Sequence, residues 1–151
     1  MKKIIVEVIP ANEMRYETIG DWWIDPDGTW RIQVAEFEDE RHSMGIAYHE
    51  LREMMTSWVK HVQEPEVTKF DLWFEEETKA GRIPDTLDEP GNHPKCPYNS
   101  EHQKATSDEM GLMTDLDCNW WEYDEAVRKM SREQVIKNRK VDANGASINA
   151  A

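Results

Sequence analysis

Residues 48–55 read YHELREMM, and they lie in the longest segment whose periodicity is that of an amphipathic helix, about residues 40–62. Apolar residues recur along this segment at helical spacing and form one stripe, which we expect to face the core: Met44, Tyr48, Leu51, Met55, Trp58 and Val62. His49 and Glu53 are four residues apart, so a helix places them side by side on the opposite face.

The pair of His49 and Glu53 suits a divalent metal ion, because a neutral imidazole and a carboxylate on one rigid face supply two ligands. Glu50 lies beside that face, where a general base would activate a metal-bound water. H-E-x-x-E differs in one residue from the H-E-x-x-H pattern of zinc peptidases. The alternative is a solvated helix face, since Glu and His are common on the polar side of such a helix.

The length and composition of the chain exclude several classes of protein. The chain has 151 residues, enough for one domain with its own core. A formal net charge of −13 argues against direct binding to nucleic acid or to an anionic membrane. No apolar run is long enough to span a bilayer, and charged residues come too early for a signal peptide. Cys96 and Cys118 are too few for a disulfide framework, which predicts a cytoplasmic protein.

The first third of the chain predicts a small sheet. Residues 3–9 are rich in β-branched side chains, and residues 21–24 and 29–35 flank the turn sequence DPDG at 25–28. We therefore expect an α+β fold with about three antiparallel strands at the N-terminus. The long amphipathic helix over residues 40–62 would cover one face of this sheet.

The second half is expected to be helical. Its helices begin near three residues: Pro65, Glu101 and Asn119. Residues 82–99 contain four prolines and a glycine, and a loop of this length suggests a functional role. We expect one domain over residues 1–140, followed by a flexible tail over residues 141–151.

Five residues share one face of the predicted third helix, and three of them are apolar: His102, Ala105, Glu109, Leu112 and Leu116. The helix dipole disfavours an imidazolium in the first turn, so His102 stays neutral, as a metal ligand requires. The alternative is a core histidine bonded to a backbone carbonyl. With His49 and Glu53 it would complete a His₂Glu set, known from catalytic zinc sites. Asp71 and Glu101 are the carboxylates that we expect to orient the imidazoles.

Resemblances to two groups of known proteins support the predicted positions of the site residues. The order of sheet and H-E-x-x helix over residues 3–62 resembles the minimal scaffold of zincin metallopeptidases, with Glu53 where that pattern has its second histidine. Residues 2–127 resemble short uncharacterised phage and prophage proteins. Five motifs carry this second likeness: His49-Glu50-Leu51-Arg52-Glu53, Phe70-Asp71, Pro90-Gly91, Pro97-Tyr98-Asn99-Ser100-Glu101-His102 and Trp120-Trp121-Glu122-Tyr123. The zincin likeness implies peptide-bond hydrolysis, and the phage likeness implies the host cell cytoplasm.

Together these observations predict a hydrolase of peptides or proteins that uses Zn²⁺ or another divalent metal. His49, Glu53 and His102 would be the ligands and Glu50 the general base. Two alternatives stay open, a purely structural metal site and a non-enzymatic acidic phage protein that mimics nucleic acid. A mimic needs carboxylates in rows at phosphate spacing, whereas the acidic runs here belong to different predicted elements: 36–40, 75–77, 85–89 and 115–117.

Overall fold

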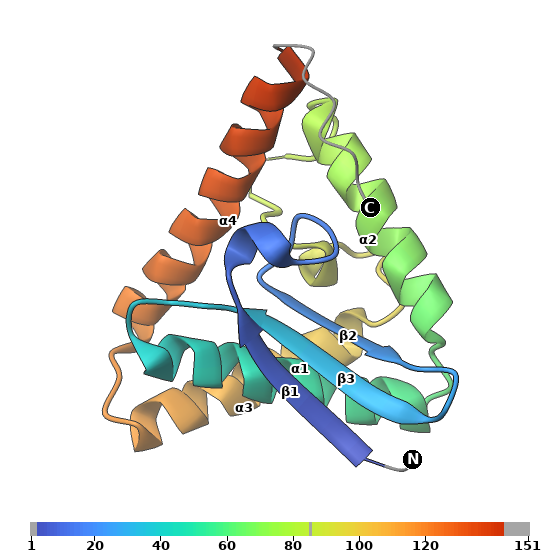
Figure 1. The fold of residues 1–151 in the computed structure, drawn as a ribbon, viewed down its shortest axis with the longest axis vertical. Helices are drawn as coiled ribbons and strands as arrows, with labels where there is room; N and C mark the ends of the chain where they lie inside the picture. Colours follow the sequence, from blue (N-terminus) through green and yellow to red (C-terminus); the bar gives the residue numbers. More distant parts are fainter. Residues whose placement is uncertain (1–2, 85, 144–151) are drawn as a thin grey trace.

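The computed structural model describes residues 3–84 and 86–143. Within these ranges lie three strands, four α-helices and two short 3₁₀ turns: β1 Lys3–Ile9, η1 Ala11–Glu13, β2 Gly20–Ile24, β3 Thr29–Ala35, α1 Glu40–Val59, α2 Glu64–Lys79, η2 Pro90–Asn92, α3 Asn99–Asp115 and α4 Trp120–Ala143 (Figure 1). The predicted α+β fold is confirmed. Among the described residues, no helix has the length and apolar character needed to cross a membrane.

The three strands form one sheet in the order β1-β3-β2. The predicted hairpin of β2 and β3 is present, and Gly28 closes its turn with a φ of 83°. β1 runs parallel to β3, so the prediction of an all-antiparallel sheet is wrong for this strand. Residues 10–19 connect β1 to β2 and leave room for one strand between them. β3 then occupies this position and pairs with both earlier strands.

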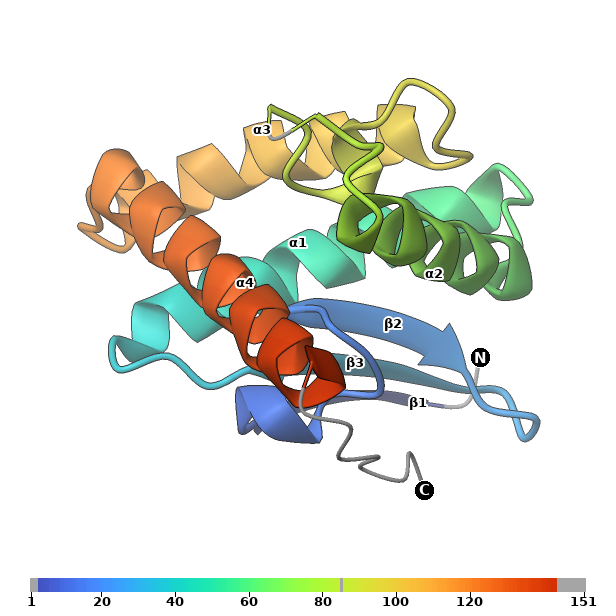
Figure 2. The ribbon, with the colours of Figure 1, turned by 90° about the horizontal axis from the view of Figure 1, so that it is seen from above.

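Helix α1 lies between the sheet and α3, as Figure 2 shows, and it packs against β2, β3 and α3. Helices α2 and α4 stand on opposite sides of the region above β2 (Figure 1). A central helix of this kind has neighbours on two sides. It therefore buries a wider surface than a helix that only covers a sheet.

The buried side of α1 differs from the prediction. Most of the expected core stripe is exposed: Met44, Tyr48, Met55 and Trp58. The side that carries His49, Glu53 and Met54 is buried instead. The periodicity of apolar residues does not reveal this side, because its buried residues include polar ones. Hydrogen bonds between these polar groups, and not their hydropathy, allow them to be buried.

The helix ends lie near the predicted positions. α1 ends three residues early, where His61 adopts a φ of 61°. Pro65 is in the first turn of α2, and the Asn119 side chain accepts a hydrogen bond from the Trp121 backbone at 2.9 Å, which caps α4. α4 continues through residues 141–143, and the rest of the predicted tail, 144–151, lies outside the described residues.

Met54→Ala is expected to lower the free energy of unfolding by about 2–5 kcal/mol, because it removes a fully buried side chain from the core. Met55→Ala is the matched control, and we expect a change of less than about 1 kcal/mol because Met55 is 41% exposed. Urea denaturation followed by circular dichroism measures both values. Similar losses at the two positions would contradict the observed packing of α1.

Candidate metal centre

His49 and Glu53 of α1 meet His102 of α3 in a buried group that could hold a metal ion. His49 Nε2 lies 3.0 Å from His102 Nδ1, and Glu53 Oε2 lies 3.5 Å from the first atom and 3.1 Å from the second. A tetrahedral zinc ion with bonds of about 2.0–2.1 Å separates its ligand atoms by about 3.3–3.4 Å. The three atoms therefore have nearly the spacing of one face of that tetrahedron, and their predicted convergence is confirmed.

Each imidazole directs its other ring nitrogen at a carboxylate. His49 Nδ1 lies 2.9 Å from Glu109 Oε2, and His102 Nε2 lies 3.2 Å from Glu89 Oε2. The hydroxyl of Tyr123 donates a hydrogen bond to the second oxygen of Glu109. Metal-ligating histidines commonly donate their free N–H to a carboxylate, which fixes the ring and makes it a stronger ligand. Both rings here are held in that way.

Glu53 is also fixed at both of its oxygens. Trp22 of β2 donates its indole N–H to Glu53 Oε1 at 2.9 Å, while Oε2 faces the two imidazoles. Burial is the largest single effect and opposes ionisation, but the hydrogen bonds with His102 and His49 and the charges of these rings together outweigh it and lower the pKa of Glu53 to about 2. Glu53 is therefore an ionised carboxylate at neutral pH, as a metal ligand must be.

The two carboxylates expected to orient the imidazoles lie elsewhere. Asp71 accepts hydrogen bonds from the hydroxyls of Tyr98 and Tyr16, the latter at 3.1 Å. Glu101 forms an ion pair with Lys60. The structure gives the expected role to Glu109 and Glu89 instead.

The sequence contained a signal for one of the two carboxylates that do reach the imidazoles. Glu109 shares the inward face of its helix with His102, so periodicity already placed it near the site. Glu89 lies in the long loop, where no periodicity applies. Its position could be found only from the tertiary structure.

Two glycines allow the backbone to approach these side chains closely. A Cβ atom at Gly91 would lie 2.3 Å from Cγ of His102, and one at Gly20 would lie 2.2 Å from Oε1 of Glu50. Any larger residue would displace the ring or the carboxylate. The loop over residues 82–99 thus contributes both Glu89 and Gly91 to the surroundings of His102.

A cavity of about 220 Å³ opens beside the three residues, and His49, Glu53 and His102 all line it. Glu50 also lines this cavity, and no hydrogen bond or ion pair reaches it from the part of the chain that the structure describes. Burial raises the pKa of Glu50 well above its ordinary value, and the negative charge of Glu53 raises it further. Glu50 is therefore a carboxylate beside the metal-ligand group with its proton affinity increased.

The two imidazoles can share only one extra proton at their facing nitrogens. His49 Nε2 and His102 Nδ1 are 3.0 Å apart, so one of them must accept a hydrogen bond. Burial alone would lower the pKa of both rings, but the hydrogen bonds with Glu109 and Glu53 raise the pKa of His49 well above its ordinary value, and those with Glu53 and Glu89 raise the pKa of His102 to about 9. The pair therefore holds one extra proton at neutral pH, which differs from the neutral His102 expected from the helix dipole.

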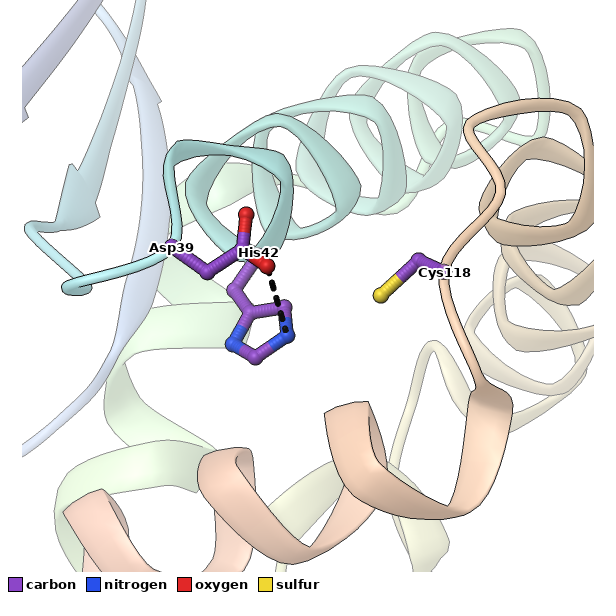
Figure 3. A group of neighbouring side chains, drawn as sticks. All are labelled: Asp39, His42 and Cys118. Atoms are coloured by element: carbon purple, nitrogen blue, oxygen red, sulfur yellow. Dashed lines mark ion pairs between the residues drawn. The ribbon is translucent and has the colours of Figure 1, made fainter.

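A second group of possible ligands, Asp39, His42 and Cys118, lies where the start of α1 meets the segment before α4 (Figure 3). Asp39 is already bound to Arg41, whose Nη2 lies 2.6 Å from Oδ2 and whose Nε lies 3.0 Å from Oδ1. A metal ion would have to displace this guanidinium and tolerate its charge. The group is thus a weaker candidate than the buried one.

Glu109→Gln is expected to weaken metal binding by about 10–100-fold, because the amide cannot polarise the N–H of His49 as a carboxylate does. Glu101→Gln is the matched control on the same helix, since Glu101 is also buried but pairs with Lys60. Competition with a chromophoric chelator measures both affinities. A loss confined to Glu101→Gln would contradict the assigned contacts.

Metal binding is expected to release about one proton per ion at pH 7, because the ion must displace the extra proton of the imidazole pair. The raised pKa of His102, about 9, keeps this proton bound at neutral pH. Apparent affinity should therefore rise about tenfold per pH unit between pH 6.5 and 8.5. Calorimetry in buffers of different ionisation enthalpy counts the protons, and pH-independent affinity would exclude this protonation scheme.

Comparison with models of protein families, with curated proteins and with solved structures finds no match to this chain. The buried group and the cavity beside it are therefore the observations on which a functional interpretation rests. Their geometry is specific enough to support one.

Proposed function

We propose that the protein binds one zinc ion through His49, Glu53 and His102 and hydrolyses peptide bonds, with Glu50 as the general base. The spacing of the three ligand atoms, 3.0, 3.1 and 3.5 Å, is the observation that carries this proposal. Two imidazole nitrogens and one carboxylate oxygen form a ligand set of catalytic zinc sites. The carboxylates on both outer ring nitrogens support the same proposal.

The donor set favours zinc over the other common divalent ions. Ca²⁺ and Mg²⁺ prefer oxygen ligands, whereas two of the three donors here are nitrogens. The nearly tetrahedral spacing also suits zinc, which has no preference for square or octahedral coordination. Other transition metals with an affinity for imidazole are the alternatives that metal analysis would reveal.

The open side of the group supports a catalytic role rather than a structural one. Structural zinc sites are closed by four protein ligands, while catalytic sites keep one position for water or substrate. Here His49, Glu53 and His102 all line the cavity. A molecule in the cavity could therefore reach a fourth coordination position.

The residues around the cavity would have different roles in hydrolysis. His49, Glu53 and His102 would hold the zinc ion, which would supply a Lewis acid and lower the pKa of a bound water to about 7. Glu50, with its raised pKa and without a hydrogen-bond partner among the described residues, would accept a proton within the cavity. Glu109 and Glu89 would hold the imidazoles in place during this transfer.

The proposal that peptide bonds are hydrolysed rests on an analogy with zincin metallopeptidases. The H-E-x-x-E helix resembles the helix of zincin metallopeptidases, in which the glutamate after the first histidine is the general base. Glu53 takes the place of the second histidine and supplies an oxygen ligand instead of a nitrogen. Glu50 occupies the position of the base in this comparison.

Glu50→Gln is expected to retain zinc and to lower the rate of peptide hydrolysis by about 10²–10⁴-fold, because the amide keeps the shape of Glu50 without its basicity. Glu53→Gln is the comparison variant and should lose zinc, since it replaces an anionic ligand. Elemental analysis of protein purified without a nickel column gives the metal content, and a mixed peptide library provides the substrates. Loss of zinc from Glu50→Gln would make Glu50 a ligand rather than the base.

A further inference from the structure

We infer that two copies of this chain associate by pairing their β1 strands antiparallel, in a register centred on Ile5. β1 lies at one edge of the sheet, and no strand among the described residues pairs with its outer side (Figure 1). It has no proline and keeps an unbroken register with β3, so neither a proline nor a bulge protects this edge. None of residues 3–9 lines the cavity, so this surface is separate from the proposed catalytic site.

The backbone of three β1 residues points away from the sheet. The carbonyl of Ile9 accepts a hydrogen bond from the N–H of Glu36 at 2.8 Å, so the backbone groups of Ile9 face β3. The direction of these groups alternates from one residue to the next along a strand. The N–H and C=O groups of Ile4, Val6 and Val8 therefore face outward, where a second strand could bind them.

The side chains of the same three residues form an exposed apolar surface. Ile4 is 40% exposed, Val6 47% and Val8 53%. Their register partners on β3 are all buried: Trp30, Ile32 and Val34. Opposite side chains on neighbouring strands point to the same face, and α1 packs on this face of β3 (Figure 2). β1 therefore extends the apolar face of the sheet beyond the cover of α1.

Exposed apolar residues of α1 continue this surface. The ring of Trp58 lies 5.9 Å from that of Trp30, which is the register partner of Ile4. Tyr48 and Met55 are also exposed. A single exposed apolar side chain is ordinary, whereas a contiguous patch marks an interaction surface. The outward backbone groups and the apolar patch thus belong to one surface, which suits a strand with apolar side chains.

The charges of β1 indicate that this strand is a second copy of β1. In an antiparallel pair centred on Ile5, Lys3 lies opposite Glu7 of the second copy, and two-fold symmetry repeats this pair. Opposite charges at facing positions stabilise an antiparallel pair. Glu7 lies 3.6 Å from Arg31 of its own chain, so the lysine would join an existing charge pair. The strand is therefore complementary to itself, as a symmetric interface requires.

The backbone restricts the possible registers. With Ile5 at the centre, Ile4 lies opposite Val6 of the second copy, and both residues have outward backbone groups that can bond to each other. A shift by one residue would place an outward residue opposite an inward one. A register centred on Val6 would keep the hydrogen bonds but place Glu7 opposite Ile5 and Lys3 opposite Ile9. The charges thus favour the register centred on Ile5.

The pairing would join the two sheets into one. A two-fold axis perpendicular to the sheet keeps both α1 helices on the same face, and the apolar side chains of the two β1 strands form the surface between them. β2 would then lie at the two outer edges of the joined sheet. Because the cavity is lined from β2 and not from β1, both cavities would stay open in the dimer.

Sedimentation velocity of the full chain without an N-terminal tag measures the association. An ionic strength of about 0.15 M screens the repulsion between two chains of net charge −13 beyond about 8 Å. We expect a monomer–dimer equilibrium with a Kd of about 1–100 µM. Val6→Lys should raise the Kd at least about tenfold, because it places a charge in the apolar surface between the copies. Leu72→Lys is the matched control on α2, since Leu72 is 43% exposed and outside the proposed interface.

Reversal of the charges tests the register. Lys3→Glu and Glu7→Lys, each alone, would bring like charges together twice in the dimer and should raise the Kd about tenfold. The two changes in one chain restore opposite charges and should return the Kd to within about threefold of the original. Glu7→Lys and the double variant both place a lysine near Arg31, so their difference isolates the contact between copies. Circular dichroism of each variant confirms the fold.

Four results would overturn the inference: a chain that stays monomeric up to about 200 µM, a dimer unaffected by Val6→Lys, a double variant as weak as the single ones, or oligomers that keep growing with concentration. The last result would indicate that β1 pairs with the β2 edge of the next chain. Zinc content is expected to be the same in Val6→Lys and in the unaltered chain. A chain that dimerises as described but holds no zinc would contradict the proposed function alone.

Discussion

The rest of the structure depends on one buried contact, the carboxylate of Glu53 between the imidazoles of His49 and His102. Burying a charge is costly unless partners with good geometry surround it. Trp22 donates a hydrogen bond to the other oxygen of Glu53, and the carboxylates of Glu109 and Glu89 contact the outer ring nitrogens of the two histidines. An apolar cluster of the same volume would give equal or greater stability in many proteins, so stability alone does not explain an arrangement this polar.

The fold serves this contact by bringing distant segments together. α1 provides His49 and Glu53 and α3 provides His102, while β2 supplies the indole that orients Glu53. The loop over residues 82–99 completes the surroundings, because Gly91 allows the backbone to touch the ring of His102. Rigid helices hold the ligands, and a loop with a close glycine contact fixes one of the rings. Such support holds the three side chains of the group in a fixed arrangement.

Electrostatics link the metal-ligand group to the cavity beside it. The group holds an extra proton that an ion must displace, and Glu50 stands next to it with a raised pKa. The high net negative charge of the chain, −13, is partly gathered around this cavity rather than spread evenly. The acidic residues that the sequence places in separate elements are thus partly brought together in the tertiary structure.

The sequence by itself determined the features that depend on local backbone geometry. The spacing of His49 and Glu53 places both on one face of any helix, and the DPDG turn and the capping by Asn119 are equally local. Only the tertiary structure decided that α1 buries the face of Glu53 instead of that of Met55, and that β1 runs parallel to β3. The physical reason is that a repeat fixes which side chains share a face, whereas the packing of other elements decides which face is buried.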